Sequence, residues 1–347
     1  MRVGSSGAAT TQDADLAVEI VPHEDQRRVD ITVDGKPFTS YIWPTTLTKP
    51  VLQPIHTADG VEVTRGFPPK PGERADHPHQ VGLWFTFGNV NGFDFWGNSD
   101  AIPRDRRPKM GTILHKRITE TESGSGEGRL GIEAVWQQGD GTDSLREETT
   151  FVVRAAPGVR MIDRLTTLTP LAGTVSMSDT ANGEVAEAGK EGMLGIRVTR
   201  ALEDPNETGG ALTDASGNVT EVADMDNSGV TGVYTSSEGT RGKDVWGTRG
   251  RWMMLSGTLE GKPVTIAILD APSNPGFPTY WHARGYGLFA ANPLGQAVFS
   301  EGKERLNFTI EPDRPATFRY RVLIVSSQPS SKDMEERYQE WLSQKGG

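Results

Sequence analysis

Two of the six histidines in this chain stand out because they lie only two residues apart. His77 and His79 belong to the stretch Arg74-Ala-Asp-His-Pro-His-Gln80. If the backbone is extended there, as Pro78 favours, both imidazoles project to one side. Two converging imidazoles suit acid-base catalysis or the binding of a divalent metal ion. The alternative is that both rings cap turns or bond to the backbone. Arg74 and Asp76 flank the pair, and we expect them to bind substrate.

A third histidine lies in the stretch Tyr280-Trp-His-Ala-Arg-Gly-Tyr-Gly287. In a strand, His282, Arg284 and Tyr286 share one face, and such a polar stripe is costly to bury without a partner. An imidazole, a guanidinium and a phenol can hold an oxyanion or a hydroxyl group and shuttle a proton. The alternative is an ordinary exposed strand face, which the surrounding Gly, Pro and aromatic residues argue against.

Two further segments contribute candidates. Glu191 lies between Lys190 and Gly192, where a carboxylate can be a general base, a metal ligand or a salt-bridge partner. Trp96 ends the aromatic run that begins at Val90, and aromatic rings next to polar groups are how proteins grip sugars. Core packing is the alternative for these rings, and we favour it for at least two of Phe93, Phe95 and Trp96.

Short alternating strands must position these residues. Runs such as 29–33, 147–154 and 160–168 alternate apolar and polar residues and are bounded by turn residues. Ser330 begins a pattern resembling a capping box, followed by an amphipathic stretch that predicts a helix sealing an edge or end of the sheets. The fold class is therefore all-β, a large antiparallel β-sandwich with a C-terminal helix. We expect a disordered leader over residues 1–15 and a single domain over 16–345.

Composition narrows the classes of partner. The net charge of −10 argues against nucleic acid, because an acidic surface repels phosphates. The absence of Cys excludes disulfides and Cys-ligated metals. No stretch reaches the roughly 18 apolar residues that a membrane span needs, so we expect no membrane partner and a cytoplasmic location. The oligomeric state does not follow from the sequence.

The chain resembles the bacterial DUF6807 family, also called PmoA-like. The resemblance rests on residues 63–68, 76–79 with 82–85, 90–96, 190–192 with 195–197, and 280–295. It implies a supersandwich similar to aldose-epimerase-like folds, in proteins associated with sugar oxidation and glycoside degradation. Members often carry another His where this chain has Gln80, a departure that weakens a metal site. The name PmoA refers to a subunit of an integral membrane oxygenase. This sequence has no apolar stretch long enough to span a membrane, so it does not match that name.

Three hypotheses follow. The favoured one is an enzyme acting on a sugar, glycoside or oxidised sugar, with His77, His79, Glu191 and His282 as acid-base groups or metal ligands. In this hypothesis Arg74, Asp76, Trp96, Arg284 and Tyr286 bind a small-molecule carbohydrate. No cofactor is required, although a divalent metal at His77 and His79 stays open. The second hypothesis is a carbohydrate-binding module without chemistry. The third is a non-haem metal oxygenase, with two His and Glu191 as a facial triad.

Overall fold

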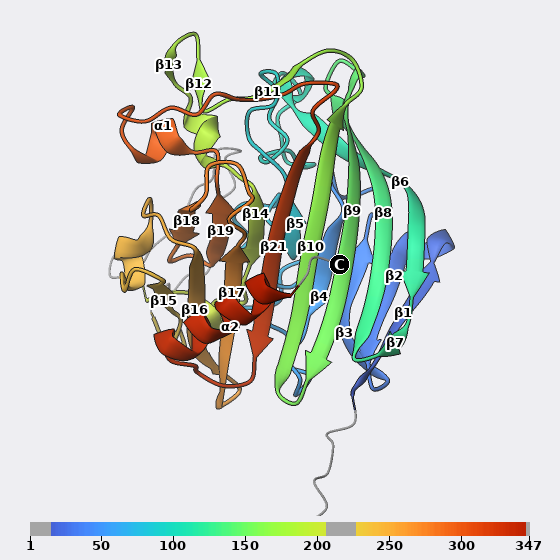
Figure 1. Ribbon diagram of the computed structural model, residues 1–347, viewed down its shortest axis with the longest axis vertical. Helices are drawn as coiled ribbons and strands as arrows, with labels where there is room; N and C mark the ends of the chain where they lie inside the picture. The colour runs from blue at the N-terminus through green and yellow to red at the C-terminus, as the bar shows by residue number, and fades with distance from the viewer. Residues whose placement is uncertain (1–14, 206–226, 345–347) are drawn as a thin grey trace, which may run out of the picture.

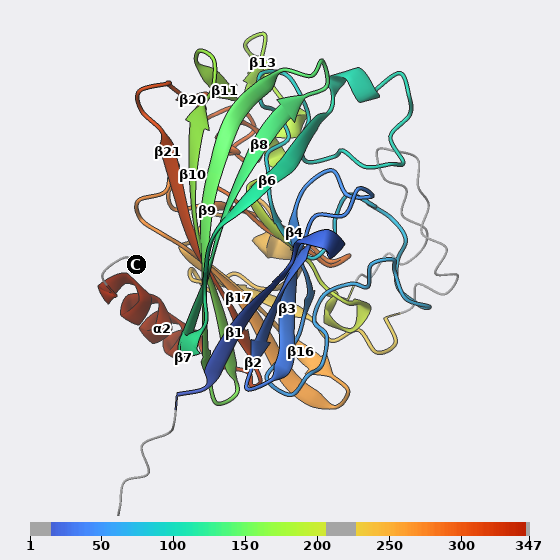
Figure 2. The ribbon, with the colours of Figure 1, turned by 90° about the vertical axis from the view of Figure 1, so that its right-hand side faces the viewer.

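The computed structural model describes residues 15–205 and 227–344, and most of them lie in antiparallel strands. The expected leader falls outside the described residues except for Asp15, and so does most of the polar segment 204–228. The extent of the single domain over 16–345 therefore stays a prediction. The fold class is confirmed, because two large antiparallel sheets stack on each other (Figures 1 and 2).

The first sheet has nine strands, and its order runs from β18 at one edge to β7 at the other. Its strands in spatial order are β18 (Tyr280–Arg284), β19 (Leu288–Asn292), β14 (Leu194–Arg197), β5 (Leu83–Phe85), β4 (Val51–Ile55), β3 (Lys36–Ile42), β2 (Arg28–Val33), β1 (Ala17–His23) and β7 (Gly124–Ser125).

The second sheet has eight strands. In spatial order they are β15 (Val233–Ser236), β16 (Trp252–Leu259), β17 (Lys262–Asp270), β21 (Ala316–Val325), β10 (Val159–Pro170), β9 (Asp143–Ala156), β8 (Glu127–Gln138) and β6 (Gly111–Glu122). Two small sheets pair β11 (Val175–Met177) with β20 (Phe308–Ile310) and β12 (Thr180–Ala181) with β13 (Glu184–Val185).

Alternation along the strands explains why the sheets stack. In β10, nearly every second residue is buried, as the period of two requires for a strand with one face in the core. The inward residues of both sheets form one apolar cluster, with Val29 and Ile31 from one sheet and Phe151 and Ile162 from the other. Apolar burial between the two layers is the main force that holds them together.

The helix α2 (Ser331–Ser343) covers the outer face of the eight-stranded sheet (Figure 1). Ser330 and Asp333 form the expected capping box. Met334, Tyr338 and Trp341 are buried against β16, β17 and β21. The sequence pattern predicts a helix at an edge or end of the sheets, but α2 packs on a face, because the outward residues of these strands are also apolar.

The outer face of the nine-stranded sheet is covered by loops instead. A small apolar cluster beneath them includes Val81, Trp84 and Trp96. The remaining helical segments are α1 (Gln296–Phe299) and five 3-10 turns, η1 (Glu24–Gln26), η2 (Arg107–Lys109), η3 (Glu187–Lys190), η4 (Arg200–Leu202) and η5 (Gly242–Val245). None of the helices in the described residues is long and apolar enough to span a membrane. The cytoplasmic location stays a prediction.

Candidate functional site

Strand register places the candidate residues on the outer face of the nine-stranded sheet. Trp281 and Ala283 belong to the core between the sheets, so His282 and Arg284 of β18 point outward. His282 lies opposite Ala290 of β19, and Ala290 lies opposite Gly195 of β14. The two small residues leave room beside His282.

The loop that carries His77 and His79 is not extended. His77 has a φ of 49°, in the left-handed region that non-glycine residues rarely adopt. Its carbonyl accepts a hydrogen bond from the amide of Gln80 at 2.9 Å, so residues 77–80 form a turn with Pro78 at its second position. The ring centroids of His77 and His79 lie 5.6 Å apart. A turn, not a strand, therefore brings the two imidazoles together.

Arg65 holds this loop in place. Its buried guanidinium donates to the carbonyl oxygens of Arg74 at 3.1 Å, Asp76 at 2.6 Å, His77 at 3.0 Å and Gln80 at 2.8 Å. These four bonds satisfy backbone oxygens that a buried loop otherwise leaves without partners. They also keep His77 in its strained conformation, a feature that functional sites often show.

Asp76 and Arg197 form the charged centre beneath the loop. Both side chains are fully buried, and the guanidinium of Arg197 lies 3.2 Å from the Asp76 carboxylate. Asp76 also accepts a hydrogen bond from Nδ1 of His77. Burial alone raises the pKa of Asp76, but the bond from His77 and the charge of Arg197 outweigh it and hold the pKa well below its usual range. The ionised Asp76 fixes the orientation of the His77 ring.

Tyr286 joins the histidine loop to β18. Its ring stacks on His77 with centroids 4.8 Å apart and an interplanar angle of 9°. The guanidinium of Arg197 lies 4.9 Å from the centre of the same ring, and Arg284 lies 5.8 Å from it. Gln80 hydrogen-bonds to the Tyr286 hydroxyl, and its Oε1 accepts from Arg197 at 2.6 Å. Burial, with a smaller effect of the Glu191 charge, raises the pKa of Tyr286 to about 12.

His282 is buried and oriented by the backbone. Its Nδ1 lies 2.7 Å from the carbonyl oxygen of Lys190, so Nδ1 carries the proton and Nε2 is a potential acceptor. Burial lowers the pKa of His282 to about 3, so the ring is neutral at physiological pH. The ring of Trp246 lies 6.4 Å from His282 and 5.5 Å from the guanidinium of Arg284. Trp246 is 40% exposed, although its residue type favours burial.

Glu191 follows Lys190 directly and is partly buried. Burial raises the pKa of Glu191 to about 7, and the charge of Lys190 opposes this rise. Within the described residues its carboxylate makes no hydrogen bond or ion pair. Residues 188–191 pack closely against Gly88, and only glycine leaves room for them there. A Cβ at residue 88 would lie 2.8 Å from the Cβ of Glu191 and 2.3 Å from the Ala188 carbonyl oxygen.

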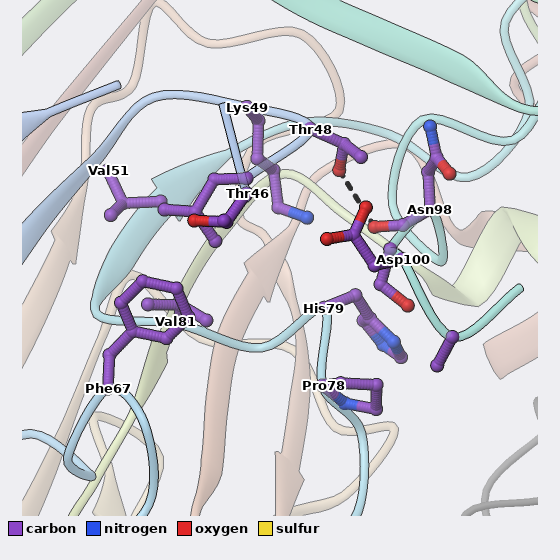
Figure 3. A pocket seen from close by; sticks show the side chains of 13 residues that line it. Thr46, Thr48, Lys49, Val51, Phe67, Pro78, His79, Val81, Asn98 and Asp100 are labelled. Carbon is purple, nitrogen blue, oxygen red and sulfur yellow. Dashed lines mark hydrogen bonds between the residues drawn. The ribbon is translucent and has the colours of Figure 1, made fainter. Parts of the chain in front are cut away.

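His79 faces a different space from His77. It lines a cavity of about 280 Å³, together with Lys49, Pro78 and Asn98 (Figure 3). Its Nδ1 is buried and has no hydrogen-bond partner in the described part of the chain. Burial, followed by the charge of Lys49, lowers the pKa of His79 well below its ordinary value.

Residues 28–339 match a family model described as a family of unknown function, DUF6807. The chain belongs to the DUF6807 family. No curated protein matches it. Among solved structures, it is similar to a galactose mutarotase-like protein from Clostridium acetobutylicum, with 9% identity, a TM-score of 0.39, and coverage of 90% of this chain and 99% of that one. It is also similar to the GH36 alpha-galactosidase AgaB from Geobacillus stearothermophilus, with 12% identity, a TM-score of 0.39, and coverage of 89% and 41%.

In this DUF6807 chain, several expected residues are brought together and others are not. A continuous series of ring and cation contacts runs from His79 through His77, Tyr286, Arg284 and Trp246 to His282. The predicted strand stripe is wrong in one detail, because β18 ends at Arg284 and Tyr286 lies in the following turn.

Trp96 and Arg74, both expected to bind substrate, are occupied within the protein. Trp96 is 1% exposed and packs edge-on against Trp84. Both rings lie against Gly195, where a side chain would collide with them. Its ring faces are covered in this structure. The Nε of Arg74 lies 2.8 Å from the carboxylate of Glu203, and both side chains are buried.

The metal hypothesis finds no ligand set among the residues that the structure describes. Across residues 15–205 and 227–344, no group of three or more His, Cys, Asp or Glu side chains is arranged to hold a metal ion. The two-His-plus-Glu191 triad is therefore not formed there. His77 also points Nδ1 at Asp76, whereas Nδ1 of His79 is enclosed and unpartnered in the same ranges.

Sequence reasoning missed three residues that organise the site: Arg65, Arg197 and Gln80. Arg197 could have been found, because alternation from Leu194 puts it on the same strand face as Gly195. Gln80 draws attention only as a departure from the family pattern, yet it joins Arg197 to Tyr286. Arg65 gives no local signal, since its four acceptors lie 9 to 15 residues further along the chain.

Proposed function

We propose that this protein is an enzyme that moves protons at or next to the carbonyl group of a sugar derivative. The observation that carries the proposal is Glu191, a carboxyl group with a pKa raised to about 7 and no hydrogen bond or ion pair in the described residues. Its charge acts on Tyr286, and the Tyr286 ring stacks on His77, an imidazole oriented by the buried Asp76. A general acid-base group works best when its pKa lies near the working pH. Structural carboxylates, by contrast, are usually paired.

The neighbouring residues have complementary roles in this proposal. His77 is the second proton-transfer group, because the Nδ1 bond to Asp76 fixes the tautomer and orientation of its ring. Arg284 supplies positive charge for a carbonyl or hydroxyl oxygen, and the Tyr286 hydroxyl, un-ionised at neutral pH, is a donor. His282 stays neutral and accepts a hydrogen bond through Nε2.

The exposed aromatic surface of the site supports a sugar as the class of substrate. Trp246 presents an exposed indole beside Arg284, and aromatic faces stack on the apolar CH faces of sugar rings. Trp246 replaces Trp96 as the ring that we assign to substrate. An indole next to a cation and an imidazole suits a polyhydroxylated carbonyl compound better than an apolar one.

The test is hydrogen exchange at carbon, which detects proton transfer even when the product is not identified. We expect wild-type protein in D2O to introduce deuterium next to the carbonyl of at least one member of a panel of aldoses, ketoses and sugar lactones, monitored by proton NMR. Glu191→Gln should abolish the exchange. The matched control is Glu187→Gln, which removes the same charge four residues away on a side chain that is 78% exposed.

Two outcomes would contradict the proposal. If Glu191→Gln exchanges deuterium at the wild-type rate, Glu191 is not the acid-base group. If sugars bind by calorimetry, but neither wild type nor any variant exchanges or converts them, the protein is a carbohydrate-binding module.

A further inference from the structure

The cavity beside His79 contains a second reactive group, the amine of Lys49. Lys49 lies just before β4, and its side chain is 3% exposed. Its Nζ donates to the carbonyl oxygen of Trp96 at 3.2 Å, and this is the one hydrogen bond that it makes within the described residues. Figure 3 shows the side chain extending into the cavity, with His79 on a separate segment. Lysines are almost never fully buried unless they are paired.

The walls of the cavity are mostly apolar. Val51 and Val81 line it, and the ring of Phe67, which is 38% exposed, lies at the cavity as well. The volume of about 280 Å³ lies just below the usual range for small-molecule sites. The cavity is partly open to solvent, so a compact ligand with an apolar portion can enter.

Burial of Lys49 favours the neutral amine, and the nearby charges do not reverse this effect. Burial lowers the pKa of Lys49 to about 7, and Asp94 is the carboxylate whose charge opposes this effect. His79 is itself kept neutral by burial and adds no anion to the cavity. Asp100 also lines the cavity, but no ion pair joins it to Lys49. A desolvated lysine in an apolar cavity is a nucleophile toward carbonyl compounds.

We propose that Lys49 captures a small aldehyde or ketone in this cavity as an imine. The uncharged Nζ adds to the carbonyl carbon, and a proton moves from nitrogen to oxygen to give a carbinolamine. The hydroxyl then leaves as water together with the remaining proton of the nitrogen, and the carbon–nitrogen double bond forms. No oxidant or reductant is needed. The Nδ1 of His79, unpartnered within the described residues, offers a hydrogen bond to the carbinolamine hydroxyl.

The proposal does not depend on Glu191 and is tested separately. Native protein is treated with benzaldehyde and sodium cyanoborohydride, which traps an imine as a stable secondary amine. Modification of each lysine is then quantified by peptide mass spectrometry. Lys303 and Lys332, with side chains 77% and 86% exposed, are internal controls.

At pH 7 an amine with a pKa near 7 has an uncharged fraction about a thousandfold larger than that of an ordinary lysine. Because burial slows access, we expect Lys49 to react at least about tenfold faster than either control. Its rate should level off above pH 8, whereas the rates of the control lysines continue to rise. Val81→Phe, which fills the cavity, should suppress modification of Lys49 alone.

The result that overturns the proposal is modification of Lys49 at or below the rate of Lys332 in the native protein, with equal rates after unfolding in urea. Lys49 would then serve only to bind the Trp96 carbonyl. This measurement uses wild-type protein, so it stays decisive even if Val81→Phe does not fold.

Discussion

Replacing Glu191 with Gln should make the protein more stable at high pH. An acid whose folded pKa is raised is protonated longer in the folded state than in the unfolded state. Glu191 therefore costs the folded state no stability well below pH 4.5, where it is protonated in both states. The loss of stability grows as the pH rises from 4.5 to 7 and is complete above 7. Gln mimics the protonated acid and has no such cost.

The size of the effect follows from the same values. A rise from 4.5 to about 7 gives a difference of about 1 kcal/mol at pH 5 and about 3 kcal/mol at pH 8 for a fully enclosed group. Glu191 is partly exposed and solvent screens part of this energy, so we expect about half of each value.

The assay is urea unfolding of wild type, Glu191→Gln and Glu187→Gln at pH 5 and pH 8. Glu191→Gln should exceed wild type by about 1.5 kcal/mol at pH 8 and by clearly less at pH 5. Glu187→Gln should show a much smaller pH-dependent gain, because its side chain is exposed and its charge is only a minor cause of the raised pKa of Glu191. A gain that is equal at both pH values, or a loss of stability at pH 8, would refute the reasoning that burial raises the pKa of this carboxyl group.

Three further outcomes are expected. Arg65→Lys should destabilise the protein by about 3 kcal/mol and increase amide hydrogen exchange in residues 74–80, because one ammonium cannot reach the four carbonyls that the guanidinium binds. Trp246→Ala should weaken sugar binding about tenfold in calorimetry while changing the free energy of unfolding by less than about 1 kcal/mol, because the indole is 40% exposed. Trp341→Ala should cost about 3–5 kcal/mol in urea unfolding, whereas the exposed Glu340→Ala should cost little.

The sandwich could be predicted because its strands carry their information locally. Alternation such as that of residues 160–168 reports which face of a strand is buried, and β10 extends over Val159–Pro170. The C-terminal helix also has local signals, in Ser330 and in its apolar stripe. The face on which the helix packs could not be predicted, since that depends on the outward residues of β16, β17 and β21 together.

The details of the site depend on contacts between distant segments, and the sequence does not display them. His77 is left-handed because Arg65 binds the carbonyls around it, not because of its own neighbours in sequence. Trp96 and Trp246 have the same residue type, yet one is buried and the other exposed. The difference arises from Gly195, whose missing side chain leaves room for Trp96 on the outer face of β14.

A raised pKa alone does not distinguish a functional carboxyl group from a structural one, and Asp270 shows why. Burial raises the pKa of Asp270 to about 7, as it does for Glu191. Asp270 accepts hydrogen bonds from Asn274 at 2.6 Å and from the amide of Thr279 at 2.9 Å, so its oxygens are committed to holding a turn. Glu191 has no such bonds in the described residues and lies where His282, Arg284 and Tyr286 converge from β18 and the turn after it. The partners of a buried acid, more than its pKa, are therefore what supports the proposal of a site on the outer face of the nine-stranded sheet.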